Sequence, residues 1–95
     1  MKNLLKEIEQ FITILIKTNP GLSGRYNYDI SYTRKDTDPW FYEEVYSVSF
    51  NFPMIYRNEV LKISKFCGIR FEHEYYSYQD SVVRFETEIK DIYRR

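Results

Sequence analysis

Apolar residues near the N-terminus recur at the spacing of a one-sided helix. Seven of them share one stripe: Leu4, Leu5, Ile8, Phe11, Ile12, Leu15 and Ile16. This stripe predicts an amphipathic helix that ends at Asn19-Pro20-Gly21, because proline cannot continue a helix and glycine favours its end. A helix lying on a membrane surface would have the same pattern, but packing against a core is its commoner use. The longest apolar stretch, residues 11–16, is far shorter than the roughly 20 residues that cross a bilayer.

After residue 24 the apolar period changes from 3.6 to 2, which is the period of a strand. Tyrosine and isoleucine alternate with polar residues over positions 25–33, and a second alternating run covers residues 40–52. In the second run the alternate residues that we expect to face a core are apolar, except for Glu44. They are Trp40, Tyr42, Tyr46, Val48, Phe50 and Phe52. Turn-forming residues at 35–39 join the two runs, so we expect an antiparallel hairpin.

The second half of the chain repeats this order. Residues 55–67 predict a shorter helix ended by Gly68, and strands follow at 69–76 and 83–89, while Ile92 and Tyr93 either extend the last strand or begin a short helix. The elements therefore run α-β-β-α-β-β. We expect an α+β fold with a four-stranded antiparallel sheet, two helices packed on one face and a single domain over residues 1–95. The strand order is either 1-2-3-4 or one with the first or fourth strand central.

A three-residue turn at Gln79–Ser81 would set the pairing of the last two strands. Tyr75 would then face Phe85, and His73 would face Thr87, on the core side. On the outward side, two pairs of like charges would oppose each other, namely Glu72 with Glu88 and Glu74 with Glu86. Each such pair destabilises a sheet by up to about 1 kcal/mol, so something must offset these four carboxylates.

Three explanations for these carboxylates remain open. Arg70, Arg84 and Lys90 could interleave with them, or a Mg²⁺ or Ca²⁺ ion could bind, although flat strands lack the convergent loop that such ions prefer. The third explanation is a basic surface on a partner protein.

A second candidate contact lies in the first hairpin, where acids flank consecutive aromatic residues. Its members are Asp36, Asp38, Trp40, Phe41, Glu43 and Glu44. Phe41 must face outward if Trp40 and Tyr42 face inward, because successive strand residues alternate. Aromatic rings ringed by charge are typical of interface hot spots, although Trp40 could instead close the open end of the core.

The sequence favours no catalytic chemistry. His73 is the only histidine, expected on the core side, and the only cysteine, Cys67, follows the end of a helix, where we expect a buried structural thiol. No phosphate-binding loop, zinc motif or nucleophile motif is present, so we expect neither an enzyme nor a cofactor. A lone cysteine cannot form an internal disulfide, which suits the cytoplasm.

Charge and composition then limit the classes of partner that we expect. Fourteen basic residues balance fourteen acidic ones, so no general attraction to nucleic acid or to a membrane is expected. Tyrosine-rich sheets can stack bases, but here acidic residues occupy the outward face and would repel phosphate. Nucleic-acid binding through the modest basic patch of Arg57, Lys62 and Lys65 is therefore a lesser alternative. We therefore expect a small binding protein that docks a basic partner. Its expected contact residues are Asp36, Asp38, Trp40, Phe41, Glu43, Glu44, Glu72, Glu74, Glu86 and Glu88.

Two further possibilities follow from the same pattern. Sheet edges with few prolines could pair between subunits, which would bury Phe41 and Val45 in a homodimer. In its size, single domain, acidic surface and lack of catalytic motifs, the chain resembles phage-encoded inhibitors such as anti-CRISPR proteins, and toxin-immunity proteins. This is a likeness of general character without a shared motif, and it implies an inhibitor that covers a functional surface.

Overall fold

A computed structural model describes residues 4–36 and 38–95; Thr37, in the predicted first turn, lies outside them. The helices are α1 (Leu4–Thr18) and α2 (Arg57–Phe66), and short 3₁₀ turns cover Pro20–Leu22 and Met54–Tyr56. The strands are β1 (Asn27–Lys35), β2 (Phe41–Pro53), β3 (His73–Ser77) and β4 (Val82–Arg94). They form one antiparallel sheet in the order β1-β2-β4-β3. The α+β prediction is confirmed, the fourth strand is central, and Ile92 and Tyr93 extend it.

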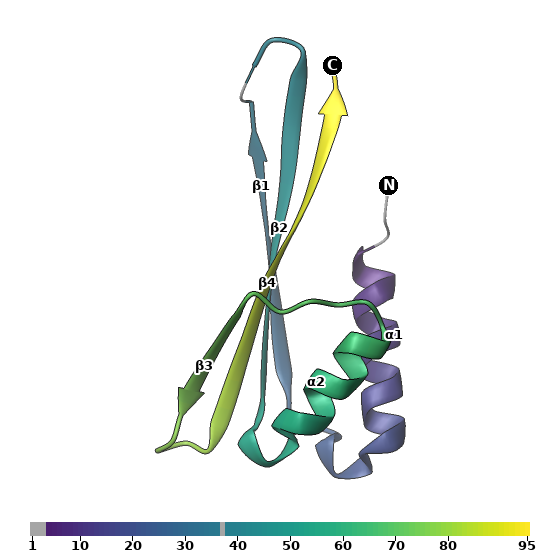
Figure 1. Cartoon of the computed structure of the whole chain (residues 1–95), viewed down its shortest axis with the longest axis vertical. Coiled ribbons are helices and arrows are strands. Elements are labelled where there is room, and N and C mark those ends of the chain that lie inside the picture. Colours follow the sequence, from purple (N-terminus) through teal and green to yellow (C-terminus); the bar gives the residue numbers. More distant parts are fainter. Residues whose placement is uncertain (1–3, 37) are drawn as a thin grey trace.

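Both helices lie on the same side of the sheet and cover only part of its length (Figure 1). We call the opposite side the open face. The upper parts of three strands project beyond the helices as a single layer, which we call the arm: the C-terminal halves of β1 and β4 and the N-terminal half of β2. The molecule is correspondingly long, with extents of 48 × 27 × 20 Å.

The core lies between the helices and the lower half of the sheet. Phe11 of α1 is fully buried and meets the rings of Phe50 and Phe52 edge-on, with centroids 5.4 Å and 6.4 Å apart. Val60 of α2 is also fully buried. The strand residues in this cluster share the parity that the alternation predicted, so the helix-facing side of β2 is as expected.

The pairing of β3 with β4 differs from the prediction by one residue. A four-residue turn, Tyr78–Ser81, joins Ser77 to Val82, and Ser81 adopts a left-handed conformation with φ of 54°. Glu74 therefore faces Phe85 on the helix side, and His73 faces Glu86 on the open face. A one-residue shift moves every side chain of a strand to the other face.

Contacts on the helix side of the sheet explain this register. The guanidinium of Arg57 in α2 donates to Glu74, with Nε 2.5 Å from Oε1, and also to the hydroxyl of Tyr76 at 2.7 Å. The core contribution expected from the start of the third strand comes instead from the extended segment before it. Phe71 there stacks on Phe85, with centroids 4.8 Å apart. A strand spanning 69–76 was therefore wrong, because β3 begins only at His73.

The first strand is also more exposed than its alternation indicated. Every residue of β1 is exposed, because β1 is an edge strand and part of it runs beyond the helices (Figure 1). Tyr28 still packs beside Phe50, but Tyr32 lies in the arm and is 50% exposed. The second helix matches its predicted stripe, and Gly68 follows it with φ of 72°.

Candidate functional site

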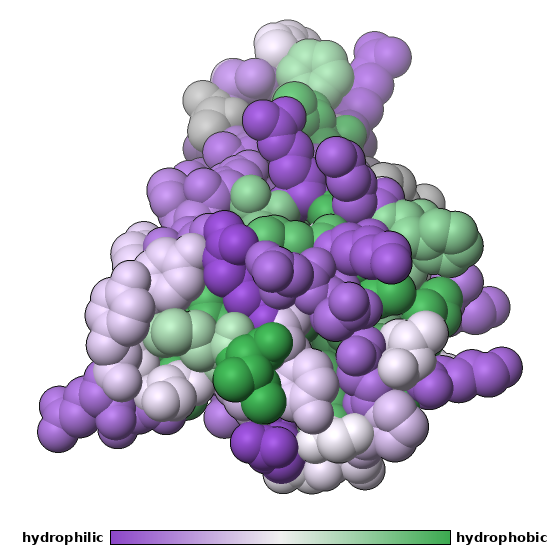
Figure 2. All heavy atoms as spheres, turned by 60° about the horizontal axis from the view of Figure 1, so that its bottom comes forward, coloured by the Kyte–Doolittle hydropathy of each residue, from purple (hydrophilic) through white to green (hydrophobic). Residues whose placement is uncertain are grey.

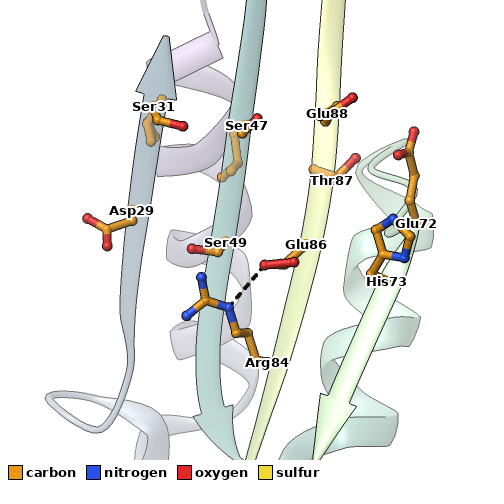
Figure 3. Close-up of a pocket in the computed structure, with 12 residues that line it drawn as sticks. Asp29, Ser31, Ser47, Ser49, Glu72, His73, Arg84, Glu86, Thr87 and Glu88 are labelled. Carbon is orange, nitrogen blue, oxygen red and sulfur yellow. Dashed lines mark hydrogen bonds and ion pairs between the residues drawn. The ribbon is translucent and has the colours of Figure 1, made fainter. Parts of the chain in front are cut away.

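The open face carries a trough of about 670 Å³ across the lower part of the sheet (Figure 3). Three small side chains lie along it, Ser31 from β1 and Ser47 and Ser49 from β2. Serines at alternating positions leave a hollow because their neighbours on the same face are longer. The trough therefore forms because the residues that β1 and β2 place on the open face at this point are small and polar.

Carboxylates surround this hollow from both sides. Asp29 lies on the β1 side, Glu86 and Glu88 lie on β4, and Glu72 reaches it from the segment just before β3 (Figure 3). The backbone N–H of Glu72 donates to the carbonyl oxygen of Glu86 at 2.9 Å, which fixes that segment against β4. We call these four residues the acidic rim.

Two of the four rim carboxylates have a cation beside them on the same strand. Arg84 Nε lies 3.1 Å from Glu86 Oε2, and Lys90 Nζ lies 3.7 Å from Glu88 Oε2. Among the described residues, neither Asp29 nor Glu72 forms a side-chain ion pair or hydrogen bond. Neutralisation by interleaved cations is thus confirmed for Arg84 and Lys90, while Arg70 forms no ion pair in the described part of the chain.

Not every predicted acidic residue belongs to the rim. Glu72, Glu86 and Glu88 are brought together, as expected, although Glu72 precedes the strand instead of pairing within it. Glu74 was wrongly placed, because it lies on the helix side, where the Arg57 guanidinium lowers its pKa by hydrogen bonding. His73 was also wrongly placed in the core. It is exposed and lines the trough, an outcome that follows from the shifted register.

The hairpin residues gather at the tip of the arm. Asp38 Oδ1 accepts the backbone N–H groups of Trp40 at 2.7 Å and Phe41 at 2.8 Å, and Asp36 accepts from Arg34 and Arg95. These two acids therefore hold the loop in shape. Trp40 is 72% exposed, so it does not close the core.

The remaining hairpin acids point to opposite faces. Phe41 and Glu43 lie on the open face, opposite Arg94 and Ile92 of β4. Glu44 lies on the helix side and accepts a hydrogen bond from the Tyr32 hydroxyl at 3.1 Å. Of the predicted contact residues, Phe41, Glu43, Glu72, Glu86 and Glu88 lie on the open face, and Glu44 and Glu74 lie on the helix side. Asp36, Asp38 and Trp40 lie in the loop at the arm tip.

The helix side of the arm carries an aromatic cluster that the sequence did not predict as a separate feature. Tyr42 stacks on Tyr93 with centroids 5.3 Å apart, and the Arg34 guanidinium lies 4.0 Å from the Tyr42 ring centre. Among the described residues the buried Tyr93 hydroxyl has no hydrogen-bond partner, and burial is the main cause that raises its pKa. The alternation of the sequence places these rings on the helix side of the sheet, but it cannot show that the helices end before reaching them.

The cysteine and the residue types that bind metals are the remaining candidates for chemistry in the described structure. Cys67 is half-buried at the end of α2, and burial raises the pKa of its thiol, which disfavours a reactive thiolate. Within residues 4–36 and 38–95, no three His, Cys, Asp or Glu side chains converge closely enough to hold a metal ion. No helix in those ranges is long and apolar enough to cross a membrane.

The end of the molecule farthest from the arm carries a second hollow, of about 530 Å³, lined among others by Arg25, Asn51 and Asp80. Figure 2 shows that its apolar atoms form separate patches between polar ones. The trough of the open face differs from this second hollow in being surrounded by four carboxylates. No protein-family model matches the chain, and neither a curated protein nor a solved structure shows significant similarity to it.

Proposed function

We propose that this protein is a non-enzymatic binding module that docks its open face on a basic surface of a partner protein. The observation that carries the proposal is the acidic rim, which surrounds a hollow on the side of the sheet that the helices leave uncovered. Within the described residues, cations accompany only two of its four carboxylates. Asp29 and Glu72 are therefore available for a partner's lysine or arginine.

The geometry suits a partner that inserts long basic side chains. Serine side chains let such a chain reach the sheet, and carboxylates around the hollow can then receive its charged end. Although the chain has zero net charge, this local field would orient a basic partner during encounter.

The open face also continues from the acidic rim to the arm tip. Ser49 in the trough and Phe41 at the tip are eight steps apart along β2, a distance of about 27 Å at the usual rise per strand residue. Phe41 is 42% exposed on that face, and the adjacent Trp40 adds an exposed ring. These rings would provide the apolar contact area that most strong interfaces require.

An inhibitor that occludes a basic functional site in the cytoplasm, in the manner of anti-CRISPR or immunity proteins, is the form of binding module we favour. Nucleic acid suits this face less well, because phosphate would meet the acidic rim. The exposed Tyr32 of β1 also lies beside a carboxylate, because its hydroxyl donates a hydrogen bond to Glu44.

The test compares site variants in quantitative affinity capture from the native host. Glu72→Lys combined with Glu86→Lys reverses the rim, whereas Glu9→Lys with Glu59→Lys makes the same charge change on the helices. A specific partner should be captured by the wild type and the helix variant, lost with the rim variant, and weakened by added salt. Equal capture of that partner by both variants would show that the rim is only solvated surface. Circular dichroism of each variant verifies folding.

A further inference from the structure

The outer edge of β1 is open along its whole length. β1 lies at one end of the strand order, spans nine residues that are all exposed, and contains neither glycine nor proline (Figure 1). The opposite edge is divided between β3, which has only five residues, and the part of β4 that extends beyond β3. A long edge strand presents a row of unpaired backbone N–H and C=O groups, which are a template for another strand.

The charges of β1 are arranged so that a second, antiparallel copy of the strand would place opposite charges beside each other. Asp29 lies near its beginning and Lys35 at its end, and residues 30–33 between them are uncharged. Among the described residues, neither Asp29 nor Lys35 has an ion pair or side-chain hydrogen bond. Arg34, in contrast, is engaged by Asp36 and by the Tyr42 ring.

We propose that two copies of the chain pair through β1, antiparallel, about a two-fold axis that passes through Tyr32. Such an axis, perpendicular to the sheet, keeps each copy's open face on the same side, so paired residues must share the same parity. With the axis at Tyr32, Asp29 of each copy lies opposite Lys35 of the other. With the axis one residue earlier, at Ser31, Asp29 would face Thr33 and the charges would not meet directly.

This pairing also accounts for the exposed rings of β1. Tyr32 of the two copies would face each other, and Ile30 of each copy would lie beside Arg34 of the other. The result is a continuous eight-stranded sheet with the two β1 strands at its centre. Both troughs would then open on the same side, with Asp29 of each copy near the junction.

The proposed dimer forms without the partner protein, so it can be tested separately. The test reverses the charges of Asp29 and Lys35, first singly and then together. Sedimentation is measured from about 1 µM to about 1 mM, a range that covers weak and moderate dimers. Asp29→Lys or Lys35→Asp should raise the dimer dissociation constant about tenfold or more, since each converts two attractive pairs into repulsive ones. Combining them should restore dimerisation. Glu9→Lys, with the same charge change as Asp29→Lys on α1, should have no effect.

Cross-linking then tests the position of the axis. In a Cys67→Ser background, Tyr32→Cys should form an intermolecular disulfide, because directly opposed strand residues lie about 4.5–5.5 Å apart at Cα. Ser31→Cys should not, since its two copies would be offset along the strands. Preferential cross-linking at residue 31 would overturn the proposed axis. A monomer throughout the concentration range, a dimer unaffected by the single charge changes, or a partner strand occupying β1 in place of a second copy would overturn the pairing.

Discussion

Phe50→Ala tests the packing of the sheet against the helices. Phe50 is 1% exposed, and its ring lies 5.4 Å from Phe11, 5.8 Å from Phe52 and 5.7 Å from Phe71, measured between centroids. Deleting a ring at the centre of such a cluster leaves a cavity that rigid neighbours cannot refill. We expect a loss of about 3–5 kcal/mol, a large part of the 5–15 kcal/mol that typically stabilises a domain.

The assay is urea denaturation followed by circular dichroism. With an m-value of about 1–2 kcal/mol per molar urea, the unfolding midpoint should fall by about 1.5–5 M. Phe41→Ala is the matched control, because Phe41 lies on the same strand but on the open face and is 42% exposed. It should cost less than about 1 kcal/mol. If Phe50→Ala does not fold, Phe50→Leu should still cost about 1–2 kcal/mol. Equal losses for Phe50→Ala and Phe41→Ala would refute the assignment of the two faces.

Three further predictions concern single side chains. Arg57 lowers the pKa of Glu74, so this carboxylate stabilises the fold above its unfolded pKa of about 4.3 and loses that contribution as the pH falls through the lowered value. The stability difference between wild type and Glu74→Gln, from urea midpoints, should therefore shrink between about pH 5 and pH 3; a constant difference would contradict the ion pair. Tyr93→Phe removes a buried hydroxyl that has no hydrogen-bond partner among the described residues. The free energy of unfolding should stay unchanged or rise by up to about 1 kcal/mol, seen as an unchanged or higher melting temperature. A clearly lower melting temperature would show that this hydroxyl does form a stabilising hydrogen bond. Trp40→Ala, at the exposed arm tip, should change stability by less than about 0.5 kcal/mol yet weaken partner capture; retained capture would remove the tip from the interface.

The elements themselves could be predicted because their periods are strong and uninterrupted. The stripe of α1 and the alternation of β2 each extend over many residues, and the turn residues between them set the ends. Short connections between strands then required antiparallel pairing. Because only one face of the sheet is apolar, both helices had to pack on that face. Strand order could not be predicted, because residues 57–72 allow β3 to lie on either side of β4.

The register of β3 was missed for a specific reason. His73-Glu74-Tyr75-Tyr76 has aromatic and polar residues at both parities, so alternation did not decide its face. The decisive contact, between Arg57 and Glu74, joins residues distant in sequence. The same limit applies to the site. Its acidic residues were found by parity, whereas the serine-lined hollow and the projecting arm depend on where the helices end.

Carboxyl footprinting of the protein with its captured partner tests the proposed docking surface most directly. Carbodiimide labelling is compared in the free and bound states at Glu72, Glu86 and Glu88 of the rim, and at Glu7, Glu9 and Glu59 of the helices. We predict strong protection of the rim with little change on the helices. Protection confined to the helices, or unchanged labelling of the rim, would contradict recognition through the side of the sheet that carries the serine-lined hollow.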